Sequence, residues 1–107
     1  YTLSPSYDLI NTRIHVNDRD FALDGGLFKD VFESEEVKTN GRVGLHDFEE
    51  FGRRLGIMEP RMARLLKPFL QQQDLVETLI QRSFLNPETK HFYLNEYVFR
   101  CGQLNKT

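Results

Sequence analysis

The sequence predicts a mainly α-helical protein (α+β), in which a helical bundle over residues 45–107 follows an irregular segment with short β-strands over residues 1–44. Apolar residues recur at three- and four-residue steps after Gly44, which is the period of an amphipathic helix. Before Gly44, short extended pieces alternate with turn-forming residues. With 107 residues, 39% of them hydrophobic, the chain is expected to form a single unit with one modest core.

The segment before Gly44 is expected to hold short strands between turns. The extended pieces are "YTL", "TRIHV" and "FAL". The intervening turn signals are "SPSYD", "NDRD" and "DGG". Residues 29–44 are charged and poor in aliphatic side chains, so they predict a surface connection with one helical turn.

Four helices are expected after Gly44, where the apolar residues begin to recur at the helical period. The first lies in "LHDFEEFGRRLG" and ends at Gly56, since glycine readily adopts the left-handed conformation that stops a helix. The second has Pro60 in its first turn, and Pro68 is expected to kink or end it. The third follows in "DLVETLIQRSFL", and Asn86 and Pro87 cap and start the fourth. The expected core-facing residues are Leu45, Phe48, Phe51, Leu55, Met62, Leu65, Leu66, Phe69, Leu70, Leu75, Val76, Leu79, Ile80, Phe84, Leu94, Tyr97, Val98 and Cys101.

Composition argues against several classes of protein. The net charge of -2 and pI near 5.9 provide no overall field that attracts nucleic acid, so direct nucleic-acid contact is not expected. The one cysteine, Cys101, cannot form an internal disulfide, which fits a cytoplasmic setting. No apolar run approaches the roughly 20 residues of a membrane-spanning helix, so no membrane partner is expected. Because the chain begins at Tyr1 with β-prone residues, we expect it to be part of a longer protein.

Several polar side chains have the residue types of metal or catalytic sites but not their spacing. The acids of "NDRDFALDGG" are misspaced for an EF-hand, so a solvated turn is favoured over calcium binding. These acids are Asp18, Asp20 and Asp24. The three histidines are too far apart in the sequence to indicate zinc. They are His15, His46 and His91. Cys101, on the apolar face of the last expected helix, is interpreted as a buried thiol.

A basic cluster and an aromatic cluster lie on the expected helices. The basic residues are Arg53, Arg54, Arg61, Arg64 and Lys67. They could contact DNA or a partner protein with an acidic surface, but a helix face paired with Glu49, Glu50 and Glu59 is favoured. The aromatic residues Phe92, Tyr93, Tyr97 and Phe99 cannot all face one side of a helix. Some of them are therefore expected to cover a second surface.

Three segments carry a resemblance to a known family: "LSPSYDLINTRI", "DFALDGG" and "DFEEFGRRLGI". They resemble the C-terminal part of HipA-family serine/threonine kinases, the toxins of bacterial toxin-antitoxin systems. The likeness covers essentially the whole chain and is most specific in "LSPSYDLINTR". It implies that residues 1–44 hold a metal-site loop with short strands and that residues 45–107 form the helical part of the kinase lobe.

The resemblance implies a role for Asp8 in "YDL", which matches the family's magnesium-binding acid at the phosphates of ATP. Without the resemblance, an acid after Ser-Pro-Ser is typical of a turn or a helix cap. No catalytic residue is assigned to this chain, because it has no glycine-rich phosphate loop and no catalytic-loop Asp with a following Asn. The 107 residues are therefore not expected to transfer phosphate alone.

The resemblance also implies a substrate and partners for the intact protein. The substrate would be a serine or threonine of a protein, with aminoacyl-tRNA synthetases among the targets associated with the family. The inhibiting partner would be an antitoxin with a DNA-binding domain. The alternative is a non-catalytic helical module for protein interaction.

Overall fold

The computed structural model describes residues 2–6, 9–21 and 25–105 of the chain. Within this part it is mainly helical, as predicted, and contains no β-strand. The helices are η1 (Thr12–Ile14, a 3-10 helix), α1 (Glu35–Asn40), α2 (Leu45–Arg54), α3 (Glu59–Leu70), α4 (Asp74–Arg82) and α5 (Pro87–Asn105). None of these helices is long and apolar enough to cross a membrane.

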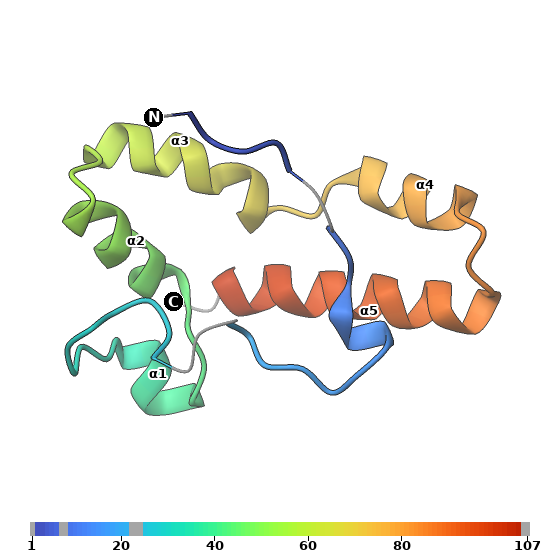
Figure 1. Cartoon of the computed structure of the whole chain (residues 1–107), viewed down its shortest axis with the longest axis horizontal. Coiled ribbons are helices and arrows are strands. Elements are labelled where there is room, and N and C mark those ends of the chain that lie inside the picture. Colours follow the sequence, from blue (N-terminus) through green and yellow to red (C-terminus); the bar gives the residue numbers. More distant parts are fainter. Residues whose placement is uncertain (1, 7–8, 22–24, 106–107) are drawn as a thin grey trace.

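Helix α5 organises the molecule. It runs through the middle, with α3 and α4 in succession along one side and η1 crossing it (Figure 1). Helix α2 contacts α3, and α1 lies near the end of the molecule where α5 terminates (Figure 1). The N-terminal segment is therefore held against the C-terminal helix.

Local sequence signals set most helix ends. Gly56 has φ of 82° and its N–H bonds to the carbonyl of Arg53, which confirms the predicted stop after α2. Pro60 lies in the first turn of α3, and Asn86 Oδ1 accepts a hydrogen bond from Thr89 N at 2.8 Å before α5. Pro68 lies within the last turn of α3, which ends at Leu70 as a helix separate from α4.

The prediction of a strand in "TRIHV" is wrong. The Asn11 side chain accepts a hydrogen bond from Arg13 N at 3.1 Å, and His15 N bonds to Thr12 O at 2.9 Å. These local bonds favour a 3-10 turn, and no neighbouring strand in the described segments competes for the same groups. Thr2 and Leu3 of "YTL" also lie outside any strand, whereas most of "FAL" falls outside the described residues.

The buried apolar core of the described part is small. Met62 is 4% exposed, and Ile80 and Cys101 are 6% exposed. Gly52 allows α2 and α3 to approach, because an added Cβ there would lie 2.6 Å from Met62 Sδ. The burial of Cys101 agrees with the prediction of a structural thiol.

Many residues predicted to face the core are instead exposed. These residues are Leu55, Leu65, Phe69, Leu75, Leu79, Phe84 and Val98. Phe84 is fully exposed, and Phe69 is 62% exposed. For the residues on α3 and α4, the physical reason is that these helices contact α5 along one side and α3 also contacts α2, which leaves much of their apolar surface uncovered.

The molecule is open for its size. Its accessible surface is 8929 Å², whereas a folded monomer of this mass exposes roughly 6,200 Å². Its radius of gyration is 15.6 Å, compared with about 13 Å for a compact domain of this length. The chain thus leaves far more surface uncovered than a typical small domain.

Candidate functional site

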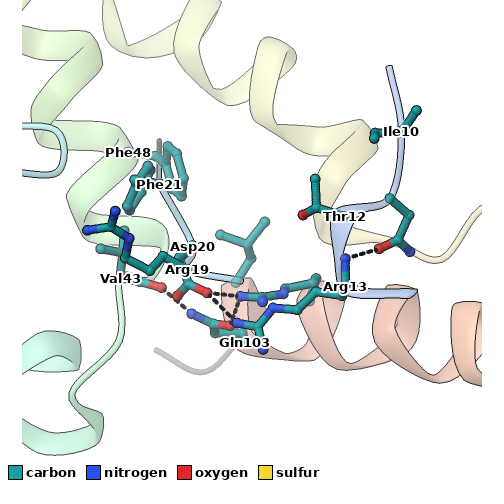
Figure 2. Close-up of a pocket in the computed structure, with 12 residues that line it drawn as sticks. Ile10, Thr12, Arg13, Arg19, Asp20, Phe21, Val43, Phe48 and Gln103 are labelled. Atoms are coloured by element: carbon teal, nitrogen blue, oxygen red, sulfur yellow. Dashed lines mark hydrogen bonds and ion pairs between the residues drawn. The ribbon is translucent and has the colours of Figure 1, made fainter. Parts of the chain in front are cut away.

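A cleft of about 340 Å³ lies where the N-terminal segment meets α5 and the beginning of α2. The chain reaches it twice near its start, at residues 10–13 and at residues 19–21. Leu104 and Gln103 line it from the last turns of α5, and Figure 2 shows Gln103 there. The cleft therefore joins segments that lie at opposite ends of the sequence.

Two arginines share one carboxylate at this cleft. Asp20 Oδ1 accepts a hydrogen bond from Arg100 Nη1 at 2.6 Å and another from Arg13 Nη2 at 3.4 Å (Figure 2). Arg13 also donates from Nη1 to Asn17 Oδ1 at 3.3 Å. These contacts connect η1 to α5, and Arg100 Nε lies 4.0 Å from a second carboxylate oxygen, Glu96 Oε2.

The bonding capacity of these arginines is not used up. Arg13 Nε is buried and has no hydrogen-bond partner among the described residues. Arg100 Nη1 makes a second, longer contact of 3.4 Å with Gln103 Oε1. Gln103 Nε2 in turn donates to the carbonyl of Val43 at 2.8 Å, which attaches the end of α5 to the chain before α2.

An apolar wall stands beside the charged group. The rings of Phe21 and Phe48 have centroids 6.4 Å apart and lie together on one side of the cleft (Figure 2). A second hollow of about 310 Å³ adjoins the cleft and is lined in part by Arg42, whose guanidinium lies 5.0 Å from the centre of the Phe99 ring. The arrangement offers guanidinium donors next to aromatic surface.

A buried polar cluster supports the neighbouring helices. Ser34 Oγ donates to Asp47 Oδ2 at 2.6 Å, and Gly44 N donates to the same oxygen at 2.9 Å. Ser34 Oγ also accepts from Val37 N at 3.2 Å at the beginning of α1. These bonds cap α1 and join it to α2, so the cluster has a structural role.

Glu36 and His46 form a second part of this cluster. The Glu36 side chain is 7% exposed, and its Oε1 lies 2.5 Å from His46 Nδ1. Burial raises the pKa of Glu36, but hydrogen bonds from its own backbone amide and from the His46 ring outweigh burial and hold the pKa below the ordinary 4.5. Glu36 is therefore a buried carboxylate stabilised in its charged form.

Asp8, the magnesium ligand implied by the family resemblance, lies outside the described residues. Among the residues that are described, no group of three or more His, Cys, Asp or Glu side chains could hold a metal ion.

The acids considered for calcium take other roles where they are described. Asp18 accepts hydrogen bonds from the Thr12 side chain and from Arg19 N, which lower its pKa. Asp20 pairs with arginines, and Asp24 lies outside the described residues. The histidines are likewise separated: His15 is exposed, whereas His46 and His91 contact Glu36 and Asn95 respectively.

The favoured interpretation of the basic cluster holds for its first two members. Arg53 pairs with Glu50 and Glu59, and Arg54 pairs with Glu50 and Asp30. The bonds from Arg54 and Arg53 lower the pKa of Glu50. The other three basic residues form no ion pair with a described residue. They are Arg61, Arg64 and Lys67.

The aromatic residues of α5 point to different surroundings, as predicted. The Tyr97 hydroxyl accepts a hydrogen bond from Gln73 N at 2.7 Å, and Tyr93 is half-buried beside α4. Phe92 is 41% exposed and Phe99 is 45% exposed.

Sequence reasoning missed Arg13, Asp20 and Arg100 as one group. Asp20 and Arg100 are 80 residues apart, so no local spacing could join them. The density of Asn, Asp and Arg in "NTRIHVNDRD" is the sequence signal that indicates a polar site at Arg13 and Asp20.

No protein-family model, curated protein or solved structure matches this chain.

Proposed function

We propose that the chain is the C-terminal helical part of a HipA-like protein serine/threonine kinase that acts in the cytoplasm. The intact protein would transfer phosphate from Mg-ATP to a serine or threonine of a protein. An aminoacyl-tRNA synthetase is the substrate class we propose, and an antitoxin with a DNA-binding domain is the proposed inhibitor. The support is the "LSPSYDLINTR" segment together with the surface of the fold.

The observation that carries the proposal is the uncovered surface. The accessible area of 8929 Å² exceeds that of a folded monomer of this mass by about 2,700 Å². This excess is as large as the share that one partner contributes to a large obligate interface. Exposed apolar residues of α3 and α4 are part of it, including Phe69 and Leu79. Such faces suit a chain that packs against further protein, here the rest of a kinase lobe.

Asp8 is the residue to which we assign magnesium. A carboxylate is the hard oxygen ligand that Mg²⁺ prefers, and one or two carboxylates with phosphate and water oxygens complete its usual shell. The ion would neutralise charge on the transferred phosphoryl group. The other catalytic groups would come from parts of the kinase outside these 107 residues.

Phosphotransfer by the product of the complete reading frame tests this proposal. We expect radiolabel from γ-labelled ATP on protein serine or threonine when Mg²⁺ is present. Asp8→Asn is expected to reduce the transfer at least about 100-fold, because a carboxylate ligand is lost. Asp74→Asn is the matched control, since Asp74 is exposed at the beginning of α4 and should leave the rate unchanged. An unlabelled lysate with the wild-type protein, or full activity of Asp8→Asn, would refute the proposal.

The second candidate is a helical module that binds another protein without catalysis, and the same exposed apolar faces favour it. Calorimetric titration of the complete product with Mg-ATP separates the two. The kinase binds the nucleotide, whereas the module releases no binding heat.

A further inference from the structure

We propose that the cleft between η1, α2 and α5 binds a small ligand that carries an oxyanion, a phosphate or a carboxylate, on an apolar body. This site is distinct from the assigned role of Asp8 and does not depend on the kinase proposal. It is built from the paired arginines, Arg13 and Arg100, and from the aromatic wall beside them (Figure 2).

Charge and free donors favour an anion. The charged side chains that line the cleft are those of Arg13, Arg19, Arg100 and Asp20, so arginines predominate there, although Glu96 also lies 4.0 Å from Arg100 Nε. Arg13 Nε is a buried donor without a hydrogen-bond partner among the described residues, and a donor left unpaired in this way costs free energy. Guanidinium forks bind phosphate and carboxylate through paired hydrogen bonds, so the residue type matches the ligand.

The surroundings increase the positive charge. Arg42 lines the adjoining hollow together with Arg13 and forms no ion pair with a described residue. The two hollows are together lined by four guanidinium groups, those of Arg13, Arg19, Arg42 and Arg100, and by one carboxylate, that of Asp20.

The apolar wall and the size define the rest of the ligand. Phe21 and Phe48 supply aromatic faces on one side of the cleft (Figure 2), and Val43 and Leu104 add aliphatic surface. A volume of about 340 Å³ is at the lower end for ligand sites, which run from roughly 300 to 1,000 Å³. The site therefore suits a body no larger than one ring with its oxyanion.

Stability alone gives a weak reason for this arrangement. The side chains of Arg100 and Asp20 are 34% and 27% exposed, and partly exposed pairs of this kind add little to the free energy of folding. A bound anion is therefore a better explanation for the placement of Arg13 and Arg100 than the contribution of their ion pairs to folding.

Titration of the 107-residue chain with phenyl phosphate, followed by the amide shifts in nitrogen-proton NMR spectra, tests the proposal. We expect saturable binding with a dissociation constant on the order of 1 mM. Inorganic phosphate and phenol are each expected to bind at least about tenfold more weakly, because each supplies only one half of the ligand. A parallel titration with benzoate compares the binding of a carboxylate with that of a phosphate on the same ring. Raising the salt concentration should weaken the binding of both.

Two substitutions with opposite expected effects separate binding from folding. Arg100→Gln should weaken phenyl phosphate binding at least about tenfold. Asp20→Asn removes the competing carboxylate and should tighten binding about threefold to tenfold. Arg82→Gln, an exposed arginine at the end of α4, is the matched control and should change nothing. If Arg100→Gln does not fold, the effect of Asp20→Asn on phenyl phosphate binding decides whether the anion binds at this cleft.

No saturable shift with wild-type protein at 20-fold the expected dissociation constant would overturn the proposal. Unchanged or weaker binding by folded Asp20→Asn would overturn it as well. Shifts that map to α4 and spare residues 10–21 and the end of α5 would place the ligand elsewhere and would have the same consequence.

Discussion

Asp47 is the buried residue whose replacement gives the sharpest test of the fold. It is 2% exposed, and its Oδ2 accepts hydrogen bonds from Ser34 Oγ and Gly44 N. Asp47→Ala removes both bonds and leaves two buried donors unpaired. Hydrogen bonds to a charged group contribute roughly 1.5–3 kcal/mol each, so the expected loss in the free energy of unfolding is at least about 3 kcal/mol. This is a large share of the 5–15 kcal/mol typical of a whole domain.

Urea unfolding followed by circular dichroism at the helical band measures this loss. Asp74→Ala is the exposed control and should lower the free energy of unfolding by only about 0.5 kcal/mol, through the charge at the beginning of α4. Ser34→Ala combined with Asp47→Ala should cost less than the sum of the single changes by about 1 kcal/mol, because the two side chains share one bond. A cost below about 1 kcal/mol for Asp47→Ala, or strict additivity, would refute the reasoning.

Two further predictions concern the same region. Gly44→Ala should lower the free energy of unfolding by about 1–3 kcal/mol, because an added Cβ would lie 2.7 Å from Glu36 Cγ. Gly25→Ala, where nothing lies within 4 Å of an added Cβ, is the control in the same urea experiment. Equal effects of the two substitutions would contradict the packing argument. The pKa of Glu36 in the folded protein lies below the ordinary 4.5. The charged Glu36 side chain therefore stabilises the fold above pH 4.5, and this contribution is lost as the pH falls through the folded-state pKa. Glu36→Gln should therefore flatten the dependence of stability on pH in the acid range, and a slope as steep as that of the wild type would contradict this assignment.

The helix boundaries were the most predictable part of the fold. Gly56, Pro60 and Asn86 act through their own backbone or through a neighbour a few residues away, so their effects can be predicted from local sequence. The strand predicted in "TRIHV" failed for the opposite reason. A strand needs a neighbouring strand to accept and donate its backbone hydrogen bonds. Here the Asn11 side chain accepts the hydrogen bond of Arg13 N instead, which favours a local turn.

The candidate site was only partly accessible to sequence reasoning. Asp8 was singled out through the family resemblance and lies outside the described residues. The cleft was missed because Arg100 reaches Asp20 only once α5 has folded back across η1. The pairing of Arg53 and Arg54 with Glu50 was predicted, because those residues are three and four positions apart on one helix.

The sequence by itself determined that the chain is mainly helical, where most of its helices begin and end, and that its cysteine is buried. Those properties follow from periodicity, caps and local backbone preferences, which act over a few residues. The tertiary structure alone decided which apolar faces are covered and which charges meet. It left Phe69 and Leu79 exposed and brought Arg13, Asp20 and Arg100 together. Burial and ion pairing depend on the relative placement of distant helices, which an amphipathic pattern does not specify.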